Sequence, residues 1–348
     1  ISSVNGIYIG SENNKNLFYF SNVVTDSRNV VENSLFVPLV GEFQNGHIYV
    51  DQAIEKGATV IFIDSKEYES NSNKYKELTE ECKNLSVIVV ENTLYALQAI
   101  AETYVEQFPE LIKVAITGSS GKTTTKELVV SVLKQKYNVV YTQGNFNSET
   151  GLPLSVFKIR KEHEVGVFEM GMNRQDEIGE ISKVLKPEYA IITNIGSAHI
   201  GMLGSRDNIA IEKKKAFTYV SKTGAVFIPA EDEYCNFLQK DVLGKVVLFG
   251  ENVPSEISHV KYLEDCGLSG SVFCLDGIQI NLKIPGIYNY RNALASIALA
   301  KELDLTAEEI KTGIENLSGL NSRMEATELN LKGNIKVNLI RDCYNANF

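Results

Sequence analysis

Short apolar runs alternate with helix-like segments from the start of the chain. Runs at 34–39, 59–64 and 85–90 are rich in strand-forming residues, and between them lie helical stretches such as 51–56, which Gly57 can end. This alternation predicts a small α/β domain within the first ninety residues.

A stronger alternation follows Pro109. Proline disfavours helical backbone at the residue before it, so it marks a boundary after the helix expected over 94–107. Beyond it, helical segments separate apolar runs at 114–117, 139–142, 165–169, 190–194 and 225–228. The pattern predicts an α/β fold class, with a small N-terminal α/β domain followed by a central domain whose mostly parallel sheet is flanked by helices. Ligands bind such sheets at the carboxyl ends of the strands.

The pattern changes again towards the C-terminal end. Apolar and polar residues alternate over 271–284 around an Asp-Gly pair, which suits a hairpin. An Ala-rich helix is expected over 288–303, and a further helix opens at Thr306, which fits a capping box with Glu309. The run 335–340 predicts a strand that begins another unit and has no partners in this chain.

Composition narrows the class of protein. The chain has 348 residues, 44% of them hydrophobic, with Lys+Arg 34 against Asp+Glu 44 and a formal net charge of −10. This composition excludes a disordered chain, and no apolar run approaches the ~18 residues of a membrane span. A pI near 5.1 argues against a nucleic-acid binder. The five scattered cysteines indicate free thiols in a reducing compartment, so we expect a cytoplasmic protein.

The strongest chemical signal is the segment TGSSGKTT at 117–124, which follows an apolar strand and opens a helix. In that setting Gly118 and Gly121 let the backbone approach phosphate oxygens, Lys122 meets the β- and γ-phosphates, and Thr123 can ligate Mg²⁺. The segment therefore predicts a P-loop that binds a nucleotide. A surface turn is the alternative.

Two further polar residues follow predicted strands. Glu169 ends the apolar run 165–168, and His199 comes shortly after the run 190–194. Both would lie at the edge of the sheet that carries the phosphate loop, where a carboxylate and an imidazole can hold a metal ion. The alternatives are a solvated glutamate and a structural histidine.

These segments resemble the Mur ligase family, ATP-dependent amide-forming enzymes of cell-wall synthesis. The resemblance rests on the phosphate loop at 117–124, on Glu169-Met170-Gly171, on 193–205 with His199, on Lys213 and on 288–295. It implies catalytic roles for Lys122, Glu169, His199 and Lys213. It also implies two Mg²⁺ ions held by Thr123, Glu169, His199 and a carbamylated Lys213. For Lys213 the alternative is a solvated basic helix face.

The same resemblance implies sites for ATP and for a second substrate. The ATP-binding residues would be Gly118, Ser119, Ser120, Gly121, Lys122, Thr123, Thr124, Asn289, Asn292, Arg323 and Asp342. The residues binding the second substrate would be Ser27, Arg28, Asn45, Gly46, His47, Asn145, Asn147 and Thr150. The implied reaction joins D-alanyl-D-alanine to a UDP-N-acetylmuramoyl-tripeptide through an acyl phosphate, in a monomer that binds no nucleic acid and has no membrane span.

The implied organisation has three parts. Residues 1–92 would bind the UDP-substrate, 93–325 would form the central ATP-binding P-loop domain, and 326–348 would be a hinge and the start of a C-terminal ligase domain that is missing after Phe348. Two other hypotheses stay open. One is a related ligase that uses another amino acid, and the other is a non-catalytic fragment that binds ATP and the UDP-substrate.

Overall fold

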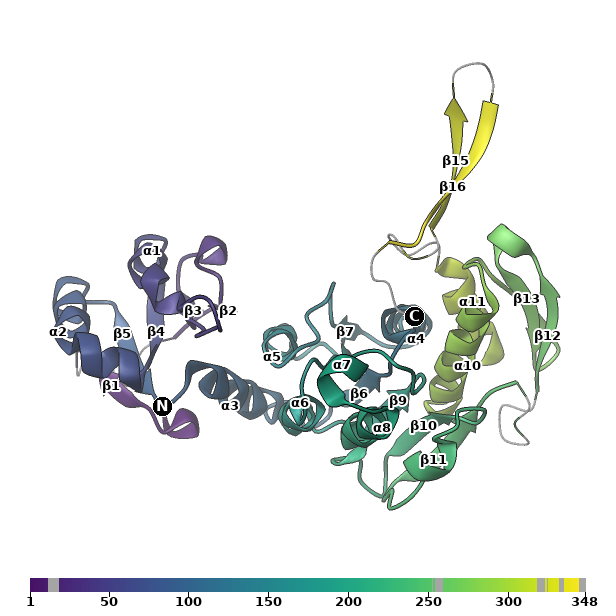
Figure 1. Cartoon of the computed structure of the whole chain (residues 1–348), viewed down its shortest axis with the longest axis horizontal. Coiled ribbons are helices and arrows are strands. Elements are labelled where there is room, and N and C mark those ends of the chain that lie inside the picture. Colours follow the sequence, from purple (N-terminus) through teal and green to yellow (C-terminus); the bar gives the residue numbers. More distant parts are fainter. Residues whose placement is uncertain are drawn as a thin grey trace. The chain divides into compact units, whose positions relative to one another are not determined.

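The computed structural model of the chain describes residues 1–11, 19–251, 253, 259–317, 323, 325–331 and 335–343. Contacts divide the chain into two compact units (Figure 1). The first contains Ile1–Pro109 and Pro153–Lys158, and the second contains Glu110–Leu152 and Ile159–Phe348.

The first unit is a small α/β body. Its sheet has the order β1-β5-β4-β3-β2, in which β2 to β5 are parallel and β1 is antiparallel to β5. The strands are β1 (Ile7–Ile9), β2 (Asn22–Val24), β3 (Ser34–Phe36), β4 (Ala58–Asp64) and β5 (Ser86–Val90). The helices are α1 (Val50–Glu55), α2 (Ser65–Glu81) and α3 (Thr93–Val105), with short 3₁₀ turns at Ser2–Val4, Ser27–Asn29 and Gly46–Tyr49.

Both faces of this sheet are covered, which explains why its central strands are apolar throughout. Alternate residues of β4 enter opposite cores: Ile61 packs in the cluster that contains Tyr75 of α2, and Phe62 packs in the cluster that contains Leu97 of α3. The expected N-terminal α/β domain is confirmed.

The second unit is built on a parallel sheet of order β11-β10-β9-β6-β8-β7. The strands are β6 (Ile112–Thr117), β7 (Val139–Tyr141), β8 (Val165–Glu169), β9 (Tyr189–Ile192), β10 (Ala225–Pro229) and β11 (Lys245–Phe249). The helices of this part are α4 (Lys122–Leu133), α5 (Gly151–Val156), α6 (Glu177–Leu185), α7 (Ile200–Leu203), α8 (Arg206–Lys214) and α9 (Cys235–Leu238). In α5, the residues from Pro153 on belong to the first unit. The expected parallel sheet flanked by helices is confirmed.

Strand register places the carboxyl ends of three strands together. Ile116 of β6 pairs with Glu169 of β8 on one side, and Thr117 of β6 pairs with Ile192 of β9 on the other. The loop that follows β6 therefore begins between Glu169 and the segment after β9. This is the edge at which parallel α/β sheets bind ligands.

A second, antiparallel sheet completes the core of this unit. It contains β12 (Val260–Asp265), β13 (Ser271–Leu275) and β14 (Ile278–Leu282), and α10 (Ile287–Glu302) and α11 (Ala307–Asn316) follow it. The hairpin turn falls at Asp276 and Gly277, whose φ angles of 50° and 84° suit the expected two-residue turn.

Helix α11 packs closely against α4, the helix that follows the phosphate loop. Ser131 Oγ of α4 donates to the carbonyl oxygen of Gly313 at 2.6 Å. A Cβ at Gly313 would lie far inside van der Waals contact with Val132, so glycine is required for this approach. The two helices thus share one well-packed interface.

One sequence expectation is wrong. The strand expected at 335–340 is β16 (Ile335–Arg341), but it has a partner, because it pairs antiparallel with β15 (Glu325–Leu331). The pattern at 325–331 alternates polar and apolar residues weakly, which hid this second strand.

The capping box of α11 forms as expected, and it gives a stability test. Thr306 Oγ1 accepts from the N–H of Glu309 at 3.3 Å, and the Glu309 carboxylate accepts from the N–H of Thr306 at 2.7 Å. Thr306→Ala should lower the free energy of unfolding by about 1 kcal/mol, because a helix N–H loses its acceptor. The control is Thr312→Ala, at an exposed position of the same helix, which should change it by less than about 0.5 kcal/mol. Equal losses in denaturant titrations would contradict a capping role.

Candidate active site

Two positions in the loop between β6 and α4 require glycine. Gly118 has φ +151°, and a Cβ there would overlap the hydroxyl of Thr193. Gly121 has φ +78°, and its Cβ would lie 2.5 Å from Asn292 Oδ1. The loop backbone therefore passes close to two other segments, one after β9 and one on α10, and side chains would prevent that approach.

The segment after β9 holds this loop by hydrogen bonds. The N–H of Ser119 donates to the carbonyl oxygen of Asn194 at 3.0 Å, and the N–H of Ser120 donates to Asn194 Oδ1 at 3.1 Å. Thr193 Oγ1 donates to the Ser120 carbonyl at 2.5 Å. The N–H of Gly196 donates to Ser119 Oγ at 2.8 Å. Sequence reasoning did not assign Thr193 and Asn194 to the site, although their place at the end of a strand was a usable signal.

Glu169 lies beside the first turn of α4. The Thr123 hydroxyl donates to Glu169 Oε2 at 2.9 Å, and Asn147 Nδ2 donates to Glu169 Oε1 at 2.7 Å. Arg323 donates to Thr123 Oγ1 at 3.0 Å. The carboxylate of Glu169 is only 2% exposed. The structure thus brings together four residues that the sequence singled out, from the phosphate loop, β8, the 144–150 loop and the C-terminal part.

Two lysine side chains converge on one acceptor. Lys122 Nζ and Lys213 Nζ each donate to the carbonyl oxygen of Gly118 at 2.9 Å. Burial lowers the pKa of Lys122, and Glu169 opposes that shift. Burial and the charge of Lys122 lower the pKa of Lys213 well below its usual range. Lys213 is 1% exposed, so the alternative of a solvated basic helix face is wrong for it.

His199 belongs to the same electrostatic group. Burial lowers its pKa, and the charges of Lys213 and Lys122 lower it further. The imidazole is therefore held in its neutral form, the form that ligates metals. Its backbone lies in the left-handed region, with φ 66°, at the residue before α7.

The predicted metal ligands can be tested against this geometry. Within the described part of the chain, no group of three or more His, Cys, Asp or Glu side chains could hold a metal ion by itself. Thr123 and Glu169 do offer adjacent oxygen atoms at the start of a helix, the donor type that Mg²⁺ prefers when substrate phosphates supply the remaining ligands. Lys213 has no oxygen to offer as an amine, so only its carbamate could be a ligand.

A cavity of about 660 Å³ adjoins the phosphate loop. Its lining includes both charged and aromatic side chains, and the volume is within the usual range for small-molecule sites. Asn292 Nδ2 donates to Asn289 Oδ1 at 3.2 Å, and Asn289 Nδ2 donates to the Pro285 carbonyl at 2.7 Å. Of the expected ATP-binding residues, Ser120, Gly121, Thr124, Asn289, Asn292, Arg323 and Asp342 line this cavity.

The residues expected to bind the second substrate fall in both units. In the second unit, Asn145 is exposed, Asn147 contacts Glu169, and Thr150 directly precedes α5. In the first unit, the side chain of Arg28 is 82% exposed, and its guanidinium pairs with Asp26 at 2.6 Å, which lowers the pKa of Asp26 to about 2.

The other four of these residues in the first unit are held by internal hydrogen bonds. Ser27 Oγ donates to Gln52 Oε1 at 2.6 Å. His47 Nδ1 lies 2.6 Å from Asn45 Oδ1, and His47 Nε2 accepts from the N–H of Asp64 at 3.0 Å. Gly46 lies so close to Leu39 that a Cβ there would be 2.8 Å from its backbone. These contacts make the Asn45–His47 turn rigid.

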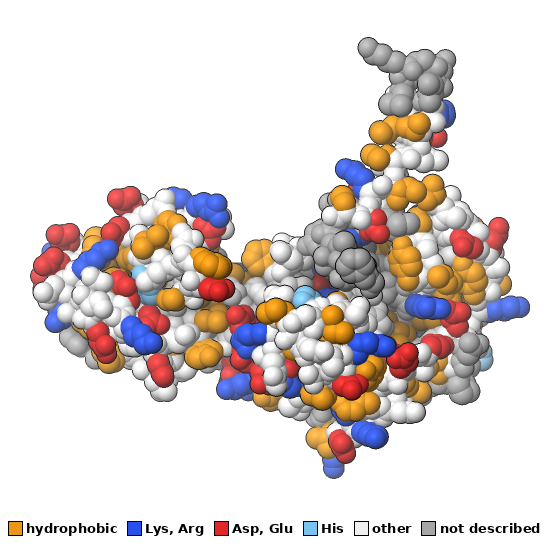
Figure 2. Space-filling view, in the orientation of Figure 1, with side chains coloured by type: hydrophobic (Ala, Val, Ile, Leu, Met, Phe, Trp, Pro, Cys, Tyr) orange, Lys and Arg blue, Asp and Glu red, His pale blue; other side chains and the backbone are white. Residues whose placement is uncertain are grey.

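The surface shows no sign of a polyanion-binding face in the view of Figure 2. On that face, acidic and basic side chains are interspersed over the residues coloured by type, and no extended basic patch forms. Among the helices that the structure describes, none combines the length and the apolar character that crossing a membrane requires.

Comparison with known families gives two matches. Residues 116–300 match the Mur ligase middle domain, and residues 19–105 match the catalytic domain of the Mur ligase family. Together they include the phosphate loop, Glu169, His199, Lys213 and both asparagines of α10.

Individual relatives agree with the family matches. The UDP-N-acetylmuramoyl-tripeptide--D-alanyl-D-alanine ligase of Treponema pallidum is 42% identical over 333 residues, which are 94% of this chain and 69% of the relative. The enzyme of the same name from Bacillus subtilis is 33% identical over 93% of this chain and 67% of its own length.

Solved structures are similar over the same extent. MurF from Acinetobacter baumannii has a TM-score of 0.83 and 28% identity, covering 99% of this chain and 72% of that protein. MurF ligase from Thermotoga maritima in complex with ADP has a TM-score of 0.74 and 27% identity, covering 95% of this chain and 73% of that protein.

The glycine geometry of the phosphate loop gives a test of binding. Gly118→Ala should lower the free energy of unfolding by about 1–3 kcal/mol and remove nucleotide binding, because the loop must move away from Thr193. The control is Gly144→Ala, where φ is +56° but no atom lies within 4 Å of the added Cβ. It should cost about 1 kcal/mol of backbone strain and keep nucleotide affinity. Calorimetric titration checks both variants, and unchanged affinity in Gly118→Ala would contradict the shape argument.

The buried imidazole of the first unit gives a pH test. Burial lowers the pKa of His47, and the charges of Glu67 and Asp64 oppose that shift. A proton on Nε2 would also face the N–H of Asp64. Below about pH 6.5 the unfolded state therefore binds more protons than the folded state. The contribution of the neutral His47 side chain to the free energy of unfolding is complete above that pH. It is lost as the pH falls towards the pKa of His47 in the folded state.

His47→Gln should therefore flatten the decline in unfolding free energy between about pH 7.5 and pH 5.5. The exposed His259→Gln is the control and should leave the decline unchanged. Parallel pH profiles for wild type and His47→Gln would show that the imidazole does not contribute.

Proposed function

Because the chain belongs to the Mur ligase family, we propose that it uses ATP to join D-alanyl-D-alanine to UDP-N-acetylmuramoyl-tripeptide in peptidoglycan precursor synthesis. Relatives that carry this activity in their names align with more than nine-tenths of the chain. The use of ATP is supported by the solved ligase that contains ADP. The geometric observation that carries the proposal is the contact of Thr123 with Glu169 at the start of α4, beside two lysines.

ATP is proposed to bind with its phosphates at the start of α4 and its nucleoside in the adjoining cavity. The helix N-terminus, Lys122 and Arg323 supply positive charge on the phosphate side. The amide of Asn292 can both donate to and accept from an adenine edge. Asp342 lines the same cavity and could accept from a ribose hydroxyl.

Mg²⁺ is proposed at Thr123 and Glu169, with a second ion at His199 and a carbamylated Lys213. When bound, the ions would offset the negative charge that gathers between the substrate carboxylate and the γ-phosphate. The neutral state that burial favours in Lys213 is the state that reacts with carbon dioxide. The low exposure of this lysine supports the carbamate, because a carbamate would remove a buried positive charge beside Lys122.

The reaction is proposed to proceed in two balanced steps. An oxygen of the terminal carboxylate of the tripeptide attacks the γ-phosphorus, so that ADP leaves and an acyl phosphate forms. The amine of D-alanyl-D-alanine then attacks the acyl carbon, the amide bond forms, and inorganic phosphate and a proton leave. Lys122 would act by neutralising charge and positioning the γ-phosphate, which is most of what phosphoryl transfer requires.

The second substrate is proposed to use the two sets of polar residues that the sequence indicated. Ser27, Arg28, Asn45, Gly46 and His47 would bind the uridine nucleotide part. Asn145, Asn147 and Thr150 would bind the peptide part. The exposed guanidinium of Arg28 suits a diphosphate, whereas the internal bonds of His47 suit a role in shaping the turn around it.

The remaining expectations are kept as proposals. We propose a UDP-substrate domain at 1–92, a central ATP-binding domain at 93–325 and a hinge at 326–348. We also propose a monomer that works in the cytoplasm and binds no nucleic acid. The acidic composition and the mixed surface charge in Figure 2 support the last point.

The function is tested by release of ADP. Purified chain, ATP, Mg²⁺ and UDP-N-acetylmuramoyl-tripeptide should release ADP when D-alanyl-D-alanine is added. Replacing these substrates with the UDP-N-acetylmuramoyl-dipeptide and a diamino acid should give no release. Release only with the second set would assign a different ligation step, and tight binding of both ligands without release would assign a binding role.

Lys122→Ala separates the two ligand sites. It should weaken ATP binding by about 100-fold, since a charge-assisted contact to phosphate is lost, and should leave the affinity for the UDP-substrate within about twofold. Lys134→Ala, at the exposed end of the same helix, is the control and should change neither affinity. Equal losses of both ligands in Lys122→Ala would contradict separate sites.

A further inference from the structure

A buried carboxylate joins two loops of the proposed active site. Glu177, at the start of α6, is 2% exposed. Its Oε1 accepts from the N–H of Glu149 at 3.3 Å, and its Oε2 accepts from the N–H groups of Asn173 at 2.6 Å and Arg174 at 3.3 Å. The first donor belongs to the 144–150 loop, and the other two belong to the 170–176 loop that follows β8.

The same two loops meet again at Glu169. The N–H of Gly171 donates to the carbonyl oxygen of Asn147 at 2.7 Å, and Asn147 Nδ2 donates to Glu169 Oε1 at 2.7 Å. Residues 147–149 are therefore held at both ends. Asn147 contacts Glu169, and the N–H of Glu149 bonds to Glu177. The position of Asn147 relative to Glu169 therefore depends on Glu177.

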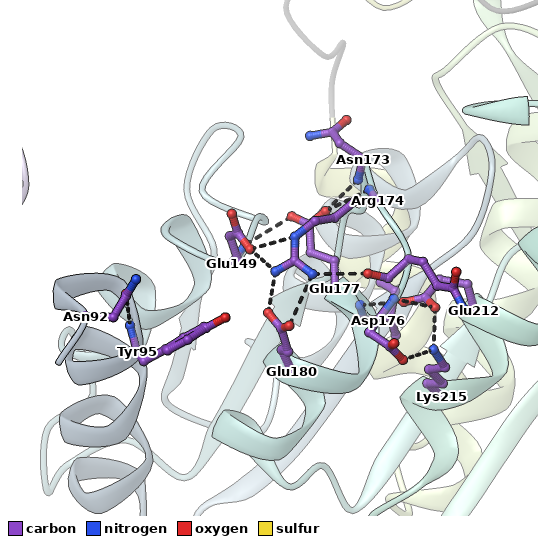
Figure 3. Close-up of polar contacts among 12 residues, drawn as sticks. Asn92, Tyr95, Glu149, Asn173, Arg174, Asp176, Glu177, Glu180, Glu212 and Lys215 are labelled. Carbon is purple, nitrogen blue, oxygen red and sulfur yellow. Dashed lines mark hydrogen bonds and ion pairs between the residues drawn. The ribbon is translucent and has the colours of Figure 1, made fainter. Parts of the chain in front are cut away.

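An ion-pair network reinforces this junction on its more exposed side. Figure 3 shows the guanidinium of Arg174 between the carboxylates of Glu149 and Glu180. Arg174 Nε lies 3.1 Å from Glu149 and its NH1 lies 3.1 Å from Glu180. These two carboxylates raise the pKa of Arg174, so the side chain stays charged. It joins the side chain of Glu149 to α6, while Glu177 holds the Glu149 backbone.

A second buried carboxylate links the 170–176 loop to α8. Glu212 is 1% exposed and accepts from the N–H groups of Asp176 and Ile178 at 2.9 Å each. Lys215 donates to it at 2.6 Å, as drawn in Figure 3. Glu212 directly precedes Lys213, so the loop that Glu177 holds is also joined to the helix that carries this lysine.

We propose that Glu177 is a positioning residue that holds the 144–150 loop in register with Glu169 and so sets the binding geometry for the peptide part of the substrate. The inference rests on the proposed function for the identity of that substrate. The hydrogen bonds themselves do not depend on it.

The chemistry requires a carboxylate at this position. Glu177 faces N–H donors with both oxygens, and each oxygen serves a different loop. In a glutamine, an NH₂ group replaces one of these oxygens. That group is itself a donor, so it cannot accept a hydrogen bond from the backbone N–H opposite it. The 170–176 loop makes two bonds to Glu177, one of them the shortest at 2.6 Å, and would keep the remaining oxygen, so the single bond to Glu149 is the one that breaks first.

The variant Glu177→Gln tests the proposal through its affinity for two ligands and its rates of amide hydrogen exchange. We expect the affinity for UDP-N-acetylmuramoyl-tripeptide to fall about tenfold, the effect of losing one buried hydrogen bond at a positioned loop, while the affinity for ATP stays within about twofold. We also expect faster amide hydrogen exchange at Glu149 and Gly171, with exchange in α4 unchanged. Calorimetry and NMR of the full chain measure these quantities.

The matched control is Lys183→Gln, which removes one charge from an exposed position of the same helix. It should leave both affinities and the exchange at Glu149 unchanged. If Glu177→Gln does not fold, Arg174→Gln replaces it, because that side chain is 42% exposed and joins the same loop. We then expect a smaller loss of the same ligand.

Three outcomes would overturn the proposal. They are unchanged affinity for the tripeptide nucleotide in a folded variant, equal losses of ATP and tripeptide nucleotide, or unchanged exchange at Glu149. If the wild-type chain does not bind the tripeptide nucleotide, the proposed function fails instead, and the exchange at Glu149 and Gly171 still decides whether Glu177 holds the loop.

Discussion

The proposed active site depends on two lysine amino groups that share one acceptor. Lys122 and Lys213 both donate to the Gly118 carbonyl, and neither is freely solvated. Two like charges at this distance in a poorly solvated environment are unfavourable unless an anion approaches or one charge is lost. The bound phosphate and the Lys213 carbamate that we propose would each relieve this repulsion. Burial lowers the pKa of His199, and the charges of both lysines lower it further.

Hydrogen bonds and close contacts of the backbone hold the segments around the two lysines in place. The Gly118 carbonyl can receive two lysines because the loop approaches Thr193 closely, which requires glycine. Asn194 holds the middle of the loop through its main chain and its side chain. On the other side of β6, the buried carboxylates Glu177 and Glu212 satisfy backbone N–H groups around the start of α6. Each of these contacts positions a segment that carries a side chain of the proposed ligand sites.

Much of the fold and part of the candidate site could be predicted from the sequence, because these features depend on residues that are close together in the chain. The phosphate loop, the Asp276–Gly277 turn and the Thr306 cap are set by residues close in sequence, and the structure contains all three features. The rest depends on tertiary packing. No pattern around Lys213 distinguishes a buried lysine from its neighbours in a basic run, and the pairing of β16 depends on a strand that is only weakly patterned. The proposed role of Glu177 was hidden for the same reason, because one of its donors, the N–H of Glu149, is 28 residues away in the sequence.

The close approach of α11 to α4 has a mechanical consequence. The backbone of Gly313 fits against Val132, and Ser131 bonds across the interface, so α4 cannot slide or turn without displacing α11. The two helices should therefore behave as a single rigid body when a nucleotide arrives. Rearrangement around the phosphate loop on ligand binding would then fall on the loops at the carboxyl ends of the strands, while α4, the proposed phosphate-binding helix, stays fixed against α11.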